Sequence, residues 1–205
     1  MSAGPSMSAQ LAIRATEHLH RRPLHTLLDH LVSSRAARAT YGVEVVVTYD
    51  PSKPDHRERQ DRSYVDFTGA TCLSGAFTAI LLKGTRVSET QEFKRTYRLT
   101  TAILQRLKSS EVAITVYRGD KENPQWINED KLAFSPLCTV HADTSAVEPK
   151  VYEGGSLTDG QPRRHYSIAY DVVLLFGLTE LQAQLRWKEN GVTKLGPATI
   201  IYEDD

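Results

Sequence analysis

The sequence has few cysteines, no net charge and no long hydrophobic run. Its 205 residues include two cysteines, Cys72 and Cys138, which lie far apart and in no spacing typical of metal ligands. So few cysteines argue against a secreted fold built on disulfides and favour a reducing compartment. We therefore expect a cytoplasmic protein.

The charge balance argues against a nucleic-acid partner. Lysine and arginine together number 25, and aspartate and glutamate also number 25. A balanced chain has no general attraction for nucleic acids or for anionic membranes, so contact with either would need a local basic patch. We predict no binding to nucleic acid.

Hydrophobic segments are short throughout the chain. The longest apolar run, near 171–178, falls well below the roughly 20 residues that a membrane-spanning helix requires. The N-terminus also lacks the continuous apolar segment of a secretory signal. The overall composition, 40% hydrophobic and 24% charged, is that of a folded globular protein.

The first 40 residues carry a helical pattern. The residues at positions i, i+3, i+4 and i+7 of one helix face are Leu24, Leu27, Leu28 and Leu31. This pattern predicts a helical N-terminal extension, 1–40, whose leucine face either covers the folded domain or docks on a partner protein. Docking is the interpretation we favour. The arginine and serine content is also compatible with a mitochondrial presequence.

After residue 40 the sequence becomes a series of short strand-like segments. Each is rich in β-branched or aromatic residues and is bounded by Gly, Pro, Asn, Asp or Ser: 42–49, 76–84, 92–100, 112–118, 132–140, 165–176 and 180–187. A helix-like insert, 101–110, separates two of them. Strands without long intervening helices predict a mainly β protein, an antiparallel β-sandwich over 41–205.

The clearest local prediction is a hairpin near the C-terminus. Leu181, Ala183, Leu185 and Trp187 alternate with polar residues, which is typical of a strand with one buried face. Asn190-Gly191 follows, and this pair favours a two-residue turn. We predict two antiparallel strands joined at this turn.

The order of segments between 76 and 140 resembles a C2 domain. The pieces are AFTAILLKG, EFKRTYRLT, EVAITVYRGD and KLAFSPLCTV, and GVEVVVTYD resembles an opening strand. The resemblance implies an eight-stranded antiparallel sandwich with loops gathered at one end. In calcium-binding members those loops carry several aspartates, because calcium takes six to eight oxygen ligands.

The sequence departs from that family at the calcium ligands. Where the resemblance implies an aspartate directly after the V-Y strand, this chain has Arg118, and a cation there repels a metal ion. The remaining weak metal candidates are Asp50, Asp120 and Asp130. We therefore predict a degenerate, calcium-independent C2-like domain without a metal site.

Two further features are candidates for binding a partner. Trp126 lies in the loop after the V-Y strand, where it either packs back on the sandwich or contacts another protein. Lys94, Arg95 and Arg98 lie in one strand-like segment and could meet anionic lipid headgroups.

Motifs of catalysis are missing from the chain. It contains no phosphate-binding loop of the G-x-x-x-x-G-K-[ST] type and no G-x-S-x-G nucleophile elbow. The histidines do not form a metalloprotease pattern. We predict a protein without enzymatic activity and without a cofactor.

These observations combine into one functional hypothesis and one alternative. The hypothesis is a non-catalytic protein-interaction or scaffold module on a C2-like sandwich, in the cytoplasm. Degenerate C2-like domains occur in ciliary and axonemal assembly proteins, so the resemblance implies a ciliary or cytoskeletal setting. The alternative is a peripheral membrane-binding C2 domain that binds phospholipid through calcium or a basic patch.

Overall fold

The structure, a computed structural model, describes residues 35–88, 91–154, 164–176, 180–197 and 199–202. The chain divides into two compact units, Met1–Ser33 and Ser34–Asp205, and the described residues all belong to the second. The predicted helical extension over 1–40 therefore lies almost entirely outside the described residues. Its described end, 35–40, holds strand β1 (Arg35–Ala36) and the first residue of β2 (Thr40–Thr48).

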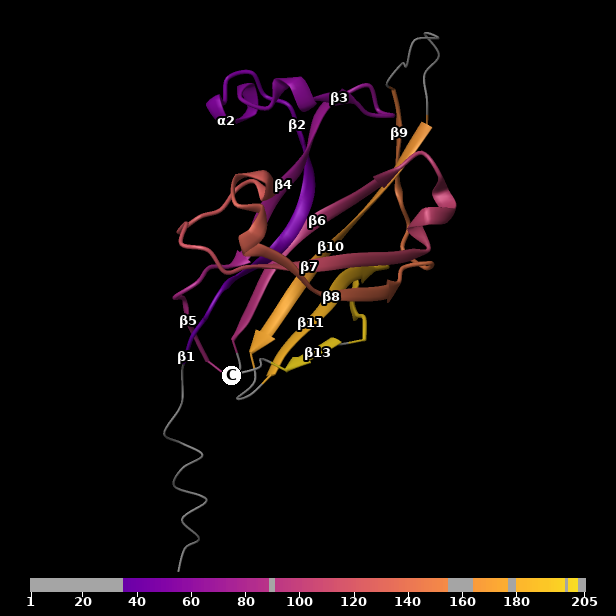
Figure 1. The fold of residues 1–205 in the computed structure, drawn as a ribbon. Helices are drawn as coiled ribbons and strands as arrows, with labels where there is room; N and C mark the ends of the chain where they lie inside the picture. The colour runs from indigo at the N-terminus through magenta and orange to yellow at the C-terminus, as the bar shows by residue number, and fades with distance from the viewer. Residues whose placement is uncertain (1–34, 89–90, 155–163, 177–179, 198, 203–205) are drawn as a thin grey trace, which may run out of the picture. The chain divides into compact units, whose positions relative to one another are not determined.

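The described part of the chain is mainly β and built from antiparallel sheets, as the sequence predicts (Figure 1). One sheet has five strands in the order β3-β4-β2-β7-β8. The strands that join β2 are β3 (Tyr64–Val65), β4 (Thr71–Leu81), β7 (Ser109–Tyr117) and β8 (Phe134–Asp143). A separate small sheet pairs β1 with β5 (Arg86–Val87).

The second large sheet is organised around β10 (Arg164–Phe176). One edge of β10 pairs with β6 (Glu92–Thr101), and its partners on the other edge are β9 (Lys150–Glu153) and β11 (Glu180–Glu189). Strand β11 in turn pairs with β12 (Val192–Leu195) and β13 (Thr199–Tyr202).

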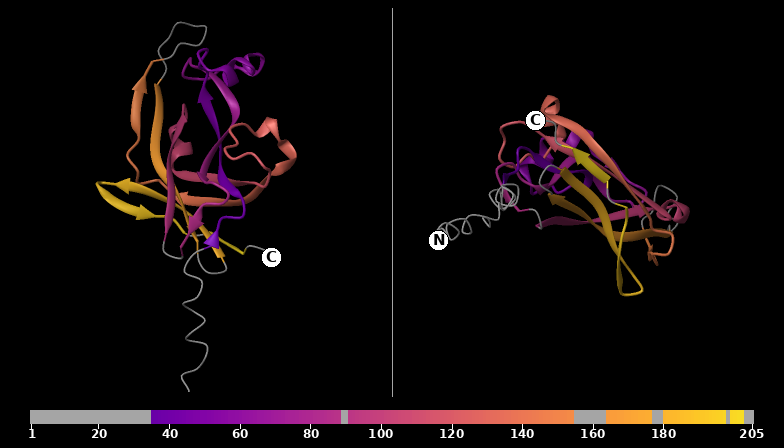
Figure 2. Two further views of the ribbon diagram at one scale, coloured as in Figure 1. Left: turned by 90° about the vertical axis from the view of Figure 1, so that its left-hand side faces the viewer. Right: turned by 90° about the horizontal axis from the view of Figure 1, so that it is seen from below.

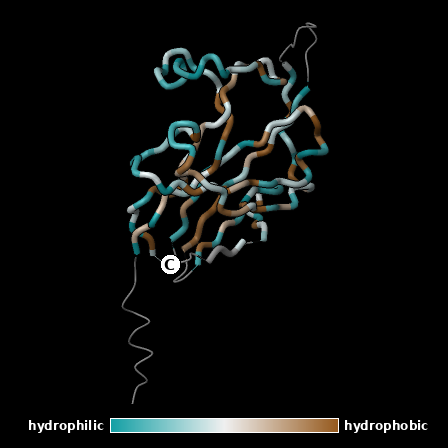
Figure 3. The backbone as a smooth tube through the Cα atoms, in the orientation of Figure 1, coloured by the Kyte–Doolittle hydropathy of each residue, from teal (hydrophilic) through white to brown (hydrophobic). Residues whose placement is uncertain are grey.

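Helical structure among the described residues is limited to single turns. The segment after β2 holds α2 (Pro54–Arg57) and the 3-10 helix η1 (Gln60–Arg62), and it is strongly hydrophilic (Figure 3). The turn η2 (Leu104–Leu107) lies inside the predicted helix-like insert. Two more turns, η3 (Ile127–Glu129) and η4 (Lys131–Ala133), follow β7.

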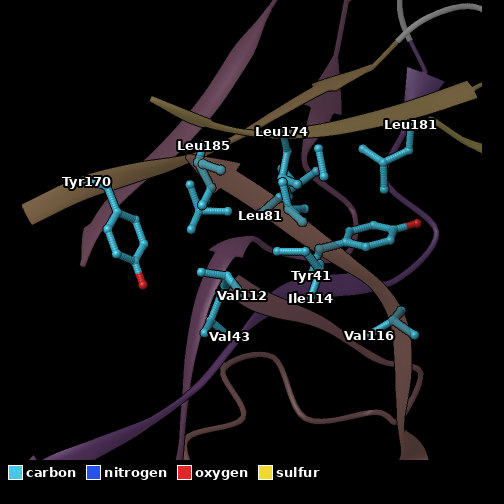
Figure 4. Close-up of a cluster of buried hydrophobic side chains, with 14 of the residues drawn as sticks. Tyr41, Val43, Leu81, Val112, Ile114, Val116, Tyr170, Leu174, Leu181 and Leu185 are labelled. Atoms are coloured by element: carbon cyan, nitrogen blue, oxygen red, sulfur yellow. The ribbon is translucent and has the colours of Figure 1, made fainter. Parts of the chain in front are cut away.

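The core forms between the inward faces of the two large sheets. In β11 the side chains of Leu181, Ala183, Leu185 and Trp187 are buried, and the residues between them are partly exposed, as the sequence pattern predicts. These side chains meet residues of the five-stranded sheet, such as Ile114 of β7 (Figure 4). Full burial of each leucine contributes roughly 1.5–3 kcal/mol, which makes this interface the main source of stability.

The predicted C-terminal hairpin is confirmed. Strands β11 and β12 pair in antiparallel register, with Glu189 opposite Val192. Both turn residues have positive φ, 50° at Asn190 and 80° at Gly191. This is the backbone of a type I′ turn, in which Asn and Gly tolerate the left-handed conformation better than other residues.

Candidate functional site

Trp126 anchors the loop that follows β7. Its side chain is 2% exposed and packs on Leu73 and Ala76 of β4. The loop backbone also attaches to β4, because the Phe77 N–H donates a hydrogen bond to the Gln125 carbonyl at 2.7 Å. Of the two roles considered for Trp126, packing on the sandwich is the one observed, so the indole offers no free surface to a partner.

A polar shell from the segment after β2 covers the indole. The indole Nε1 donates to Asp55 Oδ2 at 2.9 Å, and the Arg59 guanidinium lies 4.4 Å from the ring centroid. The ring of His56 meets the indole edge-on, at 5.5 Å between centroids. Two charged loops that are about 70 residues apart in sequence thus form one packed unit, which we call the tryptophan cluster.

Arg59 takes two of its hydrogen-bond partners from the Trp126 loop. It is 7% exposed, and its Nη2 donates to Glu129 Oε1 at 2.8 Å. Its Nε donates to Asn128 Oδ1 at 3.2 Å, and its Nη1 donates to the Asp55 carbonyl at 2.8 Å. A buried guanidinium is tolerated only when its donors are satisfied in this way.

The three weak metal candidates have separate roles. Asp50 Oδ1 accepts hydrogen bonds from the backbone N–H and the hydroxyl of Ser52, at 2.9 and 2.6 Å. Asp130 Oδ2 accepts from the Tyr117 hydroxyl at 3.0 Å, and Asp120 is fully exposed, with Oδ1 3.7 Å from Lys83 Nζ. Among the residues that the structure describes, no three His, Cys, Asp or Glu side chains are placed to hold a metal ion.

The carboxylate of Asp55 is expected to contribute stability that is lost in acid. Burial works to raise its pKa, but the hydrogen bond from Trp126 and the nearby His56 outweigh burial, so the pKa lies below 3.8. Because the folded state favours the charged form, the contribution is complete above the unfolded pKa and disappears as the pH falls through the lower folded pKa. We expect Asp55→Asn to be less stable than the unchanged protein at neutral pH, with the difference shrinking below pH 3.8.

Urea unfolding at a series of pH values measures this effect. Asp61→Asn is the matched control, because Asp61 is exposed in the same segment and has no hydrogen bond or ion pair with a described residue. A loss of stability in Asp55→Asn that is the same at neutral and at acid pH would show that the charge of Asp55 contributes nothing to the free energy of unfolding.

The basic strand β6 divides its cations between two faces. Because side chains alternate along a strand, Lys94 and Arg98 lie on one face and Arg95 lies on the other. Arg95 points toward the five-stranded sheet, where its Nη1 donates to the Ala79 carbonyl at 2.9 Å. The three residues therefore do not form one basic patch, and only Lys94 and Arg98 share a surface.

A cleft of about 1260 Å³ opens where β2 and β7 separate. The two strands pair only over 40–42 and 115–117, and from this shared end they diverge (Figure 1). We call this space the fork cleft. It is lined by unbroken runs of three strands: 43–48 of β2, 95–100 of β6 and 111–113 of β7.

The lining shows that strand edges face the fork cleft. Consecutive residues of a strand point to opposite faces, so a cavity that contacts an unbroken run meets the edge of the strand. Along 43–48, β2 pairs only with β4, and along 109–114, β7 pairs only with β8, as far as the described residues extend. Strand β6 likewise pairs only with β10 in that part of the chain. Three edges whose backbone groups have no strand partner in the described ranges thus border one cleft.

Aromatic side chains line one part of the fork cleft. His165 of β10 stacks on Tyr152 of β9, with ring centroids 5.2 Å apart and planes 7° apart. Phe67, in the turn after β3, also approaches His165, with 6.2 Å between the ring centroids, and Phe67 lines the cleft as well. Strands β3 and β9 both lie toward the upper end of the left view in Figure 2. The Nδ1 atom of His165 is buried and has no hydrogen-bond partner in the described structure.

Cys72 also borders the fork cleft. Burial raises the pKa of its thiol, and the nearby negative charge of Asp66 raises it further. The thiol form therefore predominates at neutral pH, whereas a nucleophilic cysteine needs a lowered pKa. The role of Cys72 is that of a small buried side chain.

Sequence reasoning missed two features of this region. The segment 50–63 carries dense mixed charge and no strand pattern in the sequence, yet His56 and Arg59 within it are buried in the tryptophan cluster. The fork cleft was not predicted, because its shape depends on where β2 and β7 stop pairing. The predicted docking leucines Leu24, Leu27, Leu28 and Leu31 lie outside the described residues.

Comparison with known proteins adds no relative. No family model matches the chain, and neither a curated protein nor a solved structure is similar enough to count as a match. None of the helices in the described ranges has the length and apolar character needed to cross a membrane.

Proposed function

We propose that this protein is a non-catalytic interaction module, built on a C2-like β-sandwich, that binds a protein partner in the fork cleft. The partner segment is an extended peptide that adds a strand to the free edge of β2. The setting is a cytoplasmic assembly, of which ciliary or cytoskeletal complexes are the type implied by the resemblance.

One observation carries this proposal: three strand edges whose backbone groups are unpaired among the described residues line a single cleft. Exposed edges bind extended peptides through main-chain hydrogen bonds, and pockets for alternate side chains provide specificity. The edge of β2 also presents an apolar contact, because Val46 in its middle is 54% exposed within the cleft. An exposed strand edge can pair with the edge of another molecule and so promote aggregation. An edge inside a cleft is protected from this, because the cleft admits only a single extended segment.

The C2-like part of the proposal has separate support. The strand-like segments that carry the resemblance correspond to β2, β4, β6, β7 and β8, in antiparallel sheets. At the position where the family's calcium-binding members have an aspartate, Arg118 Nη1 donates to Ser135 Oγ at 2.7 Å. A guanidinium fixed at this place supports a calcium-independent module.

The proposal is tested by selecting short random peptides on the purified protein and measuring the affinity of those recovered. Val46→Arg places a long charged side chain in the fork cleft, so we expect it to weaken peptide binding about tenfold or more. Val192→Arg is the matched control, because Val192 has nearly the same exposure, 57%, and lies on β12. Both substitutions are at exposed sites and should leave folding unchanged.

Hydrogen exchange identifies the binding mode. Strand addition predicts that a bound peptide slows amide exchange along 43–48 more than elsewhere. Recovery of no peptide, or recovery of peptides that bind Val46→Arg and the unchanged protein equally well, would contradict the proposal.

A further inference from the structure

The fork cleft is closed at one end. Strands β2 and β7 are direct neighbours over 40–42 and 115–117, and we call this the closed end of the cleft. The open end lies where β2 finishes, at Thr48. A chain inserted beside β2 cannot continue past the closed end, because β7 already occupies that edge of β2. It must end there or turn out of the cleft.

Strand pairing sets the direction of an inserted segment. Strand β2 runs from the closed end to the open end, since 43–48 follow the residues that pair with β7. Every strand pair that the structure describes is antiparallel, and antiparallel pairing is slightly more stable per residue than parallel pairing. A segment antiparallel to β2 runs toward the closed end, so its C-terminus lies there.

The side chain of Arg95 reaches the closed end. Arg95 lines the fork cleft, and its Nη1 donates to the Ala79 carbonyl at 2.9 Å. Ala79 is the partner in β4 of Gly42, the last residue of β2 that pairs with β7. From the same face of β6, the Tyr97 hydroxyl donates to the neighbouring Thr78 carbonyl at 3.3 Å. These contacts hold the start of β6, and with it the guanidinium, beside the point where β2 and β7 meet.

The charge of Arg95 is not neutralised by a described acid. Its side chain is exposed and has no carboxylate partner among the residues that the structure describes. A guanidinium has five N–H donors, so the Ala79 carbonyl leaves most of them available. Glu44 lies on the outer face of β2, and its Oε1 extends to within 4.0 Å of a Cβ added at Gly75 of β4.

Acidic residues lie toward the open end instead. Glu111 lines the cleft from the early part of β7, four residues before Thr115. Asp66 lines it from the turn after β3, and β3 lies next to the part of β4 that pairs with Thr48. The fork cleft thus has a cation at its closed end and carboxylates toward its open end. This distribution matches a segment whose C-terminus is negative and whose N-terminal part is positive.

We infer that the fork cleft binds the free C-terminus of a partner protein, with its terminal carboxylate paired to Arg95. The inference rests on the proposed addition of a strand to β2 and specifies which class of segment is added. A carboxylate accepts two parallel hydrogen bonds from a guanidinium, and such charge-assisted pairs are stronger than neutral hydrogen bonds. An internal segment would supply no carboxylate at the closed end and would have to bend out of the cleft.

Two peptide libraries test this inference on the purified protein. In one library short random peptides end in a free C-terminus, and in the other the same peptides are followed by the display protein. We expect recovery from the first library. Each recovered peptide is then synthesised with a C-terminal carboxylate and with a C-terminal amide, and the amide should bind about tenfold more weakly or worse.

The outcomes separate the inference from the proposed function. Recovery from the second library alone, or equal affinities of the carboxylate and amide forms, would overturn recognition of a C-terminus and leave strand addition to β2 standing. Recovery of no peptide from either library would contradict both.

Substitution of Arg95 identifies the group that binds the carboxylate. In Arg95→Gln the carboxylate peptide should bind only as well as the amide, and the affinity for the amide should stay unchanged. Arg98→Gln is the matched control, because Arg98 is exposed in the same strand and lines the cleft from the opposite face. Arg95→Lys keeps the charge and should retain part of the difference. A full preference for the carboxylate in Arg95→Gln would overturn the assignment.

A spin label reports the direction of the bound peptide. A nitroxide on the peptide's N-terminus should broaden the amide signals of 66–70, which border the open end, more than those of 41–43 at the closed end. The reverse pattern would place the N-terminus at Arg95 and overturn the inference.

Discussion

Replacing Trp126 by alanine is expected to lower the free energy of unfolding by about 3–5 kcal/mol. The side chain is 2% exposed and packs on Leu73 and Ala76, so its removal leaves a cavity in the tryptophan cluster. It also removes the donor to Asp55 and the ring below the buried Arg59 guanidinium. For a chain of this size the melting temperature should fall by roughly 10 °C.

The matched control for this prediction lies in the same loop. Leu132 is fully exposed, so Leu132→Ala should change the stability by less than about 0.5 kcal/mol. Trp126→Phe keeps an aromatic ring and loses the hydrogen bond to Asp55, so its stability should lie between those of Trp126→Ala and Leu132→Ala. Chemical denaturation measures all three. A loss below about 1 kcal/mol in Trp126→Ala would mean that the two loops are not held together through the indole.

Gly42→Ala is expected to destabilise the protein by about 4 kcal/mol or to prevent folding. Gly42 lies in β2 between β4 and β7, opposite Ala79 and Thr115. A Cβ at this position would stand 2.3 Å from the Thr78 carbonyl oxygen and 2.9 Å from the Ala79 Cα. Both are backbone atoms of the neighbouring strand, so the collision can be relieved only by moving β2 away from β4.

Gly84→Ala separates this collision from backbone strain. Gly84 has a φ of +81° and no atom within 4 Å of an added Cβ, so alanine there suffers only the strain of the left-handed conformation. That strain is about 1–2 kcal/mol. Soluble yield and thermal unfolding of the two variants provide the comparison. Equal stability of Gly42→Ala and Gly84→Ala would contradict the close approach of β2 and β4.

The local pattern of the chain was sufficient to predict its long strands. Alternation in β11 marks the buried face, and Asn190-Gly191 marks the turn, because both depend only on residues close in sequence. The division of Lys94, Arg98 and Arg95 between two faces also follows from alternation, although the sequence interpretation treated them as one patch. The short strands β9 and β13 were not predicted, since each has only four residues and takes its pairing from β10 or β11.

The candidate sites depended on contacts between distant segments. No property of residues near Trp126 indicates that Asp55 and Arg59, about 70 positions earlier, cover it. Of the loop acids, the weak metal candidate Asp130 accepts a hydrogen bond from Tyr117, and Glu129 pairs with the buried Arg59. The cavity of about 470 Å³ beside β10 likewise combines residues of β6, β10 and β11 with the segment before β9, and their charges become a cluster only in the folded sheet.

By itself the sequence determined a mainly β protein with antiparallel strands, an apolar face on the strand 180–187, and a tight C-terminal hairpin. These properties arise from periodicity and turn chemistry, which act over a few residues. Only the tertiary structure decided the burial of Trp126, the divergence of β2 from β7, and the gap between β9 and β11 along β10. Each of these depends on the register of strands far apart in the chain, and register is set by packing of the whole core.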